Sequence, residues 1–249
     1  RRSVLPVDLL LDLRFSGIRI VEAATLHEVV SGRVLVRSLR PSQLIFSSEL
    51  GPSRRMQQLQ NIYSFLIALV SLVLTFPLML LVALGVKLTS TGPVLFRQKR
   101  VGLNGKIFTI YKFRSMVVNA EATTGAVWAK KNDPRVTPFG AVLRKTRLDE
   151  LPQIFNVLRG DMSIVGPRPE RPEFVTVLSE QIPFYRQRHV VKPGVTGWAQ
   201  VNHKYGDTIE DTIIKLEYDL YYIKNLSPSL DLYIIFDTLK VMLFSGHGQ

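Results

Sequence analysis

The chain has 249 residues, of which 46% are hydrophobic and 21% charged, and its formal net charge is +12. This length and composition exclude global disorder and suit one or two domains with a buried core. The positive charge indicates a polyanionic partner: a nucleic acid, an anionic lipid or a phosphorylated substrate. Because the chain has no cysteine, disulfides, thiolate metal sites and cysteine nucleophiles are excluded.

The N-terminal part has the pattern of an α/β domain. Residues 17–39 predict a strand, a helix and an extended stretch, as at the end of such a domain. The chain begins at Arg1 and not at methionine, so we expect it to be part of a longer polypeptide.

The most apolar stretch is residues 62–86, IYSFLIALVSLVLTFPLMLLVALGV, in which 25 residues pass without a charge. As a straight helix this stretch is about 37 Å long, enough to cross a hydrocarbon core of about 30 Å. The alternative is a buried helix of a soluble domain. A stretch that is apolar on every face over this length favours the membrane instead.

A proline near the middle of this stretch predicts a kink. Pro77 removes one backbone hydrogen bond, and Thr75 is placed to donate to a freed carbonyl. Arg54 and Arg55 precede the stretch, and residues 87–114 include basic residues but no Asp or Glu. Positive charge favours the cytoplasmic side of a membrane, and here both flanks carry it. We therefore favour a re-entrant helix, which enters and leaves the same leaflet, over a full span.

A basic hairpin is predicted next, at residues 94–115. Asn104-Gly105 is a strong turn signal between two stretches of strand character. Lys112 and Arg114 are two residues apart, so their side chains are expected on the same face of the second strand. A solvated sheet face and a site for lipid or substrate phosphates both explain this pair, and spacing alone leaves the two open.

Two adjacent carboxylates, Asp149 and Glu150, open the sequence DELPQIFNVL. Taken alone, the stretch favours a helix cap: Asp149 as N-cap, with Glu150 and Pro152 in the first turn. The apolar positions of the predicted helix fall on one face; they are Leu151, Ile154, Phe155 and Leu158.

Arg168 stands between two prolines, Pro167 and Pro169. Each proline fixes its own backbone, so the guanidinium is presented from a rigid turn. A rigidly held cation of this kind suits a diphosphate site.

Near the C-terminus, Ser227 and Pro228 predict the cap and first residue of a mostly apolar helix. The helix is short for a span and suits the membrane interface or packing on the domain. Tyr218, Tyr221 and Tyr222, just before it, fit an aromatic belt at the lipid surface or, equally, core packing.

Three motifs, KFRSM at 112–116, LDELPQIFNVLRGDMSIVGPRPE at 148–170 and KPGVTGWAQVN at 192–202, resemble the bacterial sugar transferase family. These are the monotopic polyprenyl-phosphate phosphoglycosyl transferases. The resemblance runs from about Asn61 to Phe244 and implies a helix-rich α+β fold: a re-entrant membrane helix at 62–86, a small β-hairpin and interfacial amphipathic helices. Residues 51–249 would form the catalytic domain. Residues 1–50 resemble the C-terminal part of the Rossmann-like domain, or the linker, that precedes it in larger members.

The resemblance implies that the chain transfers a sugar 1-phosphate from a UDP-sugar to undecaprenyl phosphate and releases UMP. An aspartyl phospho-sugar would be the covalent intermediate of this first membrane step of polysaccharide or glycoconjugate synthesis. The expected place is the cytoplasmic face of the bacterial plasma membrane. Membrane lipids are expected partners, nucleic acid is not, and a homo-oligomer is compatible with the family.

Site residues are implied by the same resemblance. Asp149 and Glu150 match the family's catalytic dyad and are the expected ligands of Mg²⁺, with Asp149 as the nucleophile. A helix N-terminus would lower the pKa of Asp149 and keep it ionised. Residues expected at the substrate phosphates are Lys112, Arg114, Arg147, Arg168 and Lys204, which stands where the family commonly has arginine, and Asp161 would order the loop. Pro77 matches the proline of the family's Ser-Pro helix break, although Phe76 precedes it here.

Two rival functions explain parts of the sequence. A nucleic-acid-binding protein would explain the charge but leaves the apolar stretch unexplained, and no nucleic-acid-binding motif is present. A catalytically silent membrane scaffold for polysaccharide assembly is the stronger alternative. An assay for UMP release separates it from the enzyme. The sequence does not identify the sugar.

Overall fold

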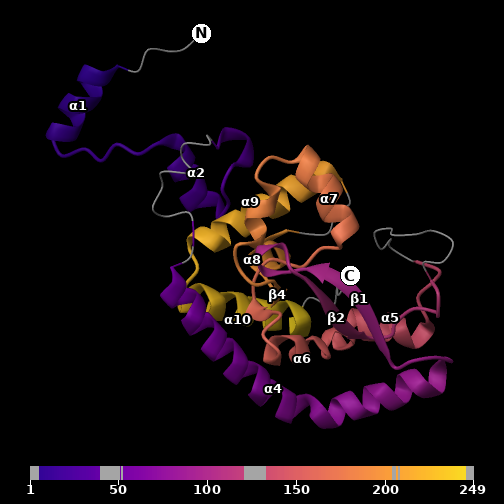
Figure 1. The fold of residues 1–249 in the computed structure, drawn as a ribbon. Coiled ribbons are helices and arrows are strands. Elements are labelled where there is room, and N and C mark those ends of the chain that lie inside the picture. Colours follow the sequence, from indigo (N-terminus) through magenta and orange to yellow (C-terminus); the bar gives the residue numbers. More distant parts are fainter. Residues whose placement is uncertain are drawn as a thin grey trace.

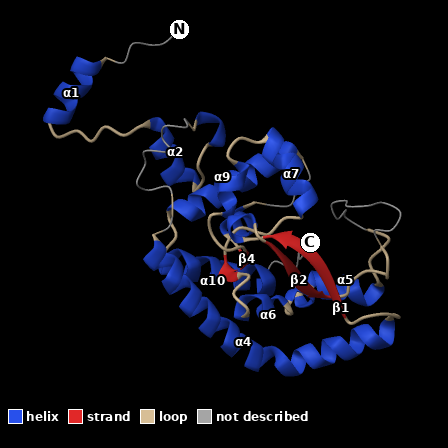
Figure 2. Ribbon diagram, viewed as in Figure 1, coloured by secondary structure: helices blue, strands red, loops and turns tan. Residues whose placement is uncertain are grey.

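A computed structural model describes residues 6–39, 51, 53–120, 133–203, 206 and 208–244. The fold is a helix-rich α+β arrangement, as predicted (Figures 1 and 2). Its longer elements are α1 (Val7–Phe15), α2 (Ala23–Ser31), α4 (Arg54–Thr89), β1 (Leu95–Val101), β2 (Ile107–Phe113), α5 (Pro138–Lys145), α6 (Gln153–Leu158), β3 (Ser163–Val165), α7 (Pro172–Gln181), β4 (Gly194–Thr196), α8 (Trp198–Asn202), α9 (Ile209–Lys224) and α10 (Pro228–Phe244). Short 3₁₀ turns are η1 (Val36–Ser38), η2 (Leu103–Gly105), η3 (Leu148–Glu150) and η4 (Tyr185–His189).

The longest helix, α4, bends in its middle and runs beneath the hairpin, α6 and α10 (Figure 1). It begins after Ser53, whose side chain accepts a hydrogen bond from the Met56 amide (3.1 Å). Among the described residues it alone is long and apolar enough to cross a membrane. Only 17% of its most apolar window is buried, so it is not the core helix of a soluble domain. The long apolar helix is thus confirmed; re-entrant insertion stays a prediction.

The prediction for Thr75 is wrong, because its hydroxyl does not bind the carbonyl that Pro77 leaves without an amide partner. Pro77 lies inside α4 and takes the backbone amide away from the carbonyl of Val73, four residues earlier. The Thr75 hydroxyl instead donates to the carbonyl of Ser71 (2.7 Å). The hydroxyl binds back to its own i−4 carbonyl in the turn before the proline, a contact that tends to bend a helix.

The predicted hairpin is confirmed. β1 and β2 pair antiparallel, with Leu95 opposite Phe113 and Val101 opposite Ile107. The turn contains Asn104 (φ 52°) and Gly105 (φ 77°), the left-handed conformations that favour these two residue types.

A second sheet, which the sequence pattern did not indicate, joins β3 and β4 in parallel, with Ser163 opposite Gly194 and Val165 opposite Thr196. The backbone of Gly194 lies so close to Gly166, one residue after β3, that a Cβ on Gly194 would lie 2.1 Å from the Gly166 nitrogen. Glycine is therefore required at this position. The sheet fixes where the loop after β3 begins.

The core is divided between two sides of this small sheet. One part packs beneath α7, α9 and α10; it includes Leu178, Tyr185, Leu216, Leu220 and Ile234. The other parts join α4 to the hairpin, α5 and α6. In α6 the buried apolar residues are Ile154 and Val157, whereas Phe155 is 38% exposed. Three of the four residues of the predicted apolar face, Leu151, Ile154 and Leu158, thus contact the core, whereas Phe155 does not.

At the N-terminus, α1 lies apart from the other helices, and α2 packs on α9 (Figure 1). Glu28 pairs with Lys224 (3.1 Å), and the Trp198 indole donates to the Gly32 carbonyl (2.7 Å). The described residues 6–39 contain no strand, so the predicted strand is not found there. The Rossmann-like origin of this region and the boundary near residue 50 stay predictions.

The cap of α10 is confirmed, since the Leu230 amide donates to the Ser227 hydroxyl (3.3 Å). Tyr222, 1% exposed, donates to Asp231 of α10 (2.8 Å), as does the Gln60 amide of α4 (2.9 Å). Tyr222 is therefore a core residue and not part of an aromatic belt. This buried cluster joins α9 and α10 to α4.

Candidate active site

An open cavity of about 1880 Å³ lies between the hairpin, α5, η3 and the helices α7 to α9. Its wall is rich in basic residues: Arg97, Arg100, Lys112, Arg114, Arg135, Arg144, Lys145, Arg147, Arg168, Arg171, Arg188 and Lys215. The acidic residues of the wall are fewer: Asp133, Asp149, Glu150, Glu170 and Asp219. Such a wall suits a ligand with several negative charges.

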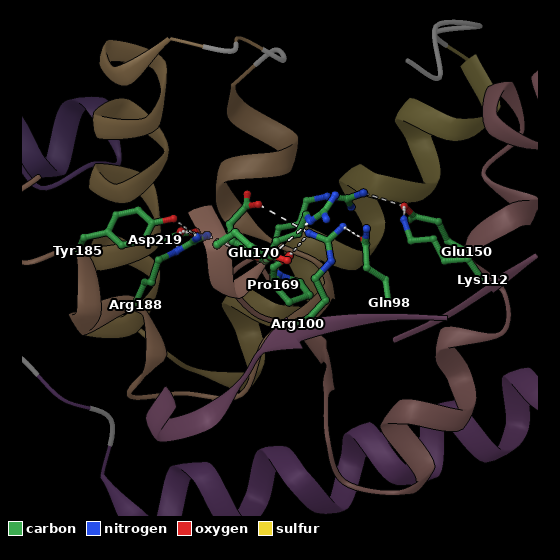
Figure 3. Close-up of polar contacts among 12 residues, drawn as sticks. Gln98, Arg100, Lys112, Glu150, Pro169, Glu170, Tyr185, Arg188 and Asp219 are labelled. Carbon is green, nitrogen blue, oxygen red and sulfur yellow. Dashed lines mark hydrogen bonds and ion pairs between the residues drawn. The ribbon is translucent and has the colours of Figure 1, made fainter. Parts of the chain in front are cut away.

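Glu150 is held between two cations at one end of the cavity. Its Oε1 accepts hydrogen bonds from Lys112 Nζ and from Arg168 Nη2, both at 2.8 Å (Figure 3 shows Glu150 and Lys112). Burial alone would raise the pKa of Glu150, but Arg168 and Lys112 outweigh it and hold that pKa well below the ordinary value. Glu150 is therefore a fixed anion at neutral pH, and three predicted site residues meet here.

Asp149 has a different environment although it is the neighbouring residue. It is 7% exposed, and among the described residues no side chain forms a hydrogen bond with it. Burial raises its pKa and Glu150 adds to the effect, while Lys112 and Arg144 oppose it. This carboxylate is desolvated and electrostatically supported, but not tied to a partner.

The helix-cap interpretation of Asp149 is wrong. Asp149 lies inside the 3₁₀ turn η3, and the residue preceding α6 is Pro152, which makes no side-chain cap. The expected lowering of the Asp149 pKa by a helix N-terminus is also wrong. Asp149 does not lie at the N-terminus of α6, and burial raises its pKa. The adjacent carboxylates are thus placed by the turn and the surrounding cavity.

The turn depends on an unusual backbone at Arg147, which has φ 59° and ψ 11°. A non-glycine residue in this left-handed region is disfavoured, and such residues cluster at functional sites. The Glu150 amide donates to the Arg147 carbonyl (3.1 Å), which closes the turn. Arg147 lines the cavity, and its backbone turns Asp149 and Glu150 into it; its predicted contact with substrate phosphates stays a prediction.

Arg114 lines the same cavity as Lys112 and Arg168, and its predicted contact with substrate phosphates stays a prediction. Its Nη2 donates to the carbonyl (2.8 Å) and hydroxyl (2.7 Å) of Ser90, at the end of α4. Arg114 stands one residue after β2 and is 6% exposed. The helix end attracts the guanidinium because its last carbonyls lack amide partners. Arg114 therefore links the end of α4 to the cavity wall.

Asp161 and Lys204 are the remaining predicted site residues. Asp161 does not line the cavity; its carboxylate lies near the side chains of Asn156 (3.4 Å) and Arg159 (3.8 Å), so its contacts are local to the turn after α6. Lys204 lies outside the described residues.

Sequence reasoning missed several cavity residues. Arg144 of α5 is one, since it contributes to the electrostatic environment of Asp149 and donates to the Ser115 hydroxyl (2.9 Å). Asp133 and Arg135 form a second pair at the wall (2.6 Å). Arg144 is the last basic residue but one before Arg147, and the basic character of the segment 144–147 was the available signal.

A magnesium ion is compatible with this geometry. Among the described residues no three His, Cys, Asp or Glu side chains converge on a metal position. Mg²⁺, however, is commonly held by one or two carboxylates together with substrate phosphates and water. Asp149 has no hydrogen-bonding side chain among the described residues, and both cations contact the same oxygen of Glu150, Oε1. The dyad thus fits an ion that takes most of its ligands from the substrate.

Comparison with known proteins places these features in a family. Residues 55–245 match the family model described as bacterial sugar transferase. A UDP-N-acetylgalactosamine-undecaprenyl-phosphate N-acetylgalactosaminephosphotransferase of Aeromonas hydrophila is 48% identical over 223 residues, which are 90% of this chain and 52% of that protein. A UDP-glucose:undecaprenyl-phosphate glucose-1-phosphate transferase of Xanthomonas campestris pv. campestris is 52% identical over 172 residues, 68% of this chain and 36% of the relative.

A shorter relative, an exopolysaccharide production protein PSS of Rhizobium leguminosarum bv. phaseoli, is 44% identical over 193 residues, which are 76% of this chain and 95% of that protein. This chain therefore spans about half or less of the first two relatives and nearly all of the third. The family match covers α4, the cavity and α10, and it confirms the resemblance of the three motifs. The chain belongs to the bacterial sugar transferase family.

Proposed function

We propose that the chain transfers a sugar 1-phosphate from a UDP-sugar to undecaprenyl phosphate and releases UMP. The observation that carries this proposal is the buried Asp149 carboxylate, which no described side chain binds, in a cavity with a basic wall. The names of the relatives supply the two substrate classes. The step would begin the synthesis of a polysaccharide or glycoconjugate, as the name of the Rhizobium relative suggests.

The chemistry proceeds in two displacements. An Asp149 oxygen attacks the phosphorus that carries the sugar, and the bond from this phosphorus to the bridging oxygen breaks, so UMP leaves with that oxygen. A phosphate oxygen of undecaprenyl phosphate then attacks the same phosphorus, the bond to Asp149 breaks, and the lipid diphosphate sugar forms. An aspartyl phosphate is a known type of enzyme intermediate, and it makes the mechanism ping-pong.

The burial of Asp149 favours this role. A carboxylate without hydrogen-bond donors is more nucleophilic than one engaged by them, and Lys112 and Arg144 support its ionised form. Attack on a diphosphate brings negative charges together, so neutralisation by cations dominates catalysis. The basic wall of the cavity supplies this neutralisation.

Glu150 is assigned to positioning and metal binding rather than to proton transfer. With its pKa held well below the ordinary value, it is a poor proton acceptor at neutral pH. Its contacts keep Lys112 and Arg168 at the end of the cavity next to Asp149. We propose that Asp149 and Glu150 hold Mg²⁺ together with the diphosphate, and that the ion supplies charge neutralisation when bound.

The membrane helix gives the lipid substrate a route to the site. Apolar side chains along α4 are exposed; they include Phe65, Leu69, Val73, Leu81 and Leu88. A layer of this kind suits the hydrocarbon of one leaflet, with the cavity above it at the headgroups. We propose a re-entrant α4 with its two ends, and the cavity, on the cytoplasmic face.

The proposal is tested by incubating the purified chain with undecaprenyl phosphate, Mg²⁺ and a panel of UDP-sugars. UMP release with at least one sugar is expected, and none with any sugar would favour the silent scaffold. The names of the relatives differ between glucose and N-acetylgalactosamine, so the panel includes both UDP-sugars. Excess chelator should abolish release and added Mg²⁺ should restore it; full activity in chelator would refute the metal.

A further inference from the structure

The loop after β3 is held by its carbonyl groups. Pro167 and Pro169 have no amide hydrogen, so at these two residues neighbouring elements can bind the backbone only through its carbonyl oxygens. Carbonyls that accept a hydrogen bond from another element are those of residues 165, 167, 168, 169 and 170. Arg168 thus stands in a segment that is fastened on both sides.

Two arginines hold the carbonyls at Arg168 itself. Arg188 Nη2 donates to the carbonyl of Arg168 (3.0 Å), and Arg100 Nη1 donates to the carbonyl of Pro169 (3.0 Å). From this backbone, which Arg188 and Arg100 hold, the Arg168 side chain extends to Glu150. Figure 3 shows Arg188 at the left, Arg100 in the middle and Glu150 with Lys112 at the right.

Arg188 and Arg100 are themselves held by other side chains. Arg188 is 6% exposed, and its Nε and Nη2 contact Asp219 Oδ2 at 3.0 and 2.8 Å. Its Nη1 donates to the Tyr185 hydroxyl (2.9 Å). Arg100 donates to Gln98 (2.6 Å) and lies 3.7 Å from Glu170. A planar guanidinium can serve several acceptors in fixed directions, which an ammonium group cannot.

We propose that Arg188 and Arg100 are positioning residues, which hold the loop so that the Arg168 guanidinium stays on Glu150. The inference rests on the proposed function. A buried pair such as Arg188–Asp219 also has a plain structural explanation, and direct contact with the substrate is a second one, because Arg188 lines the cavity. The three explanations differ in what they predict when Arg168 is removed.

The kinetic test is a double-mutant cycle between Arg188→Lys and Arg168→Gln, measured by UMP release. Arg188→Lys keeps a positive charge beside Asp219. It loses the planar guanidinium, whose nitrogens contact Asp219, Tyr185 and the Arg168 carbonyl at the same time. Alone it should lower kcat by about tenfold to a hundredfold, with KM for the UDP-sugar little changed, because catalysis is sensitive to small displacements. In the Arg168→Gln background it should have less than about a twofold further effect, since the two residues act as a unit.

The control is Glu217→Gln, which alters another buried carboxylate of α9. Glu217 is 5% exposed and accepts from the Val36 amide (3.1 Å), away from the loop. It should leave kcat unchanged, because Glu217 has no contact with the loop in the described part of the chain. Arg100→Lys alters the other arginine that holds the loop, and it serves as the test variant if Arg188→Lys does not fold.

Hydrogen exchange gives a readout that does not depend on activity. In Arg188→Lys, amides of residues 163–172 should exchange faster while the rest of the described core is unchanged; Glu217→Gln should leave this segment protected. An inactive wild-type chain would refute the proposed function and leave this outcome readable. Unchanged protection of the loop, or an equal loss of kcat in both Arg168 backgrounds, or an effect mainly on KM, would overturn the positioning role.

Discussion

Arg168 and Glu150, which are 18 residues apart in the sequence, are joined by a hydrogen bond of 2.8 Å between Nη2 and Oε1. The contact leaves Glu150 ionised and fixed, while the adjacent Asp149 is buried without such a partner. Two neighbouring carboxylates thus have pKa values that the environment pushes in opposite directions. This separation is typical of catalytic pairs with different roles.

Replacing Glu150 should destabilise the fold. In Glu150→Gln the half-buried Lys112 and Arg168 lose their common anionic partner, which should cost about 2 kcal/mol at pH 7. Because the pKa of Glu150 is lowered in the folded state, its contribution is present above its ordinary value of 4.5 and is lost as pH falls through the folded value. Denaturant unfolding of both proteins as a function of pH measures this, and a difference that grows toward low pH would contradict it.

Replacing Asp149 should have the opposite effect on stability. Burial raises the pKa of Asp149, so the folded state binds the proton more tightly than the unfolded state. The free energy of unfolding therefore falls as pH rises from the ordinary pKa of 3.8 through the raised value of the folded state. Asp149→Asn removes the buried charge and should gain on the order of 1 kcal/mol at pH 7, as functional residues often do when replaced. The gain should shrink at low pH. A lower melting temperature at pH 7 would show that the carboxylate stabilises the fold.

The local parts of the fold could be predicted from the sequence. The hairpin is indicated by Asn104-Gly105, and the start of α10 by Ser227 and Pro228, because turn and cap preferences act over a few residues. The long helix is indicated by the uncharged stretch. In contrast, β3 and β4 have three residues each, too few to show an alternating pattern.

The environment of the site could not be predicted in the same way. The motifs identified the dyad through a family resemblance, but the burial of Asp149 depends on elements far apart in the chain. Arg188 and Asp219 are 31 residues apart, and neither sequence position indicates that the pair holds the loop. Arg114 has regular β spacing from Lys112, yet it binds the end of α4, because unpaired helix carbonyls attract it.

The topology of α4 is tested by cysteine labelling, for which the cysteine-free chain is suited. Single cysteines at Gln58 and Thr89, exposed near the two ends of the helix, should both react with a membrane-impermeant reagent on the cytoplasmic side. The reason is that basic residues flank both ends of a helix that contains Pro77. Labelling from opposite sides would establish a span and refute the re-entrant arrangement.

The close approach of Gly194 in β4 to Gly166 after β3 should leave no room for a side chain at Gly194. In Gly194→Ala the new Cβ would approach the backbone nitrogen of Gly166 at 2.1 Å, and backbone on both sides cannot move without shifting the loop. A loss of about 3 kcal/mol in the free energy of unfolding is expected. Gly51→Ala is the control, because its added methyl meets no atom within 4 Å. Equal stability of the two variants would contradict the close approach.

The central claim is that Asp149 is the nucleophile, and intact-protein mass tests it most directly. The wild-type chain is incubated with Mg²⁺ and the UDP-sugar that supports UMP release, without undecaprenyl phosphate, and then denatured. A mass gain of one sugar phosphate, located at Asp149 by peptide fragmentation and absent from folded Asp149→Asn, is the predicted result. Product formation with both substrates but no adduct with the donor alone, or an Asp149→Asn enzyme that keeps most of its activity, would contradict the account.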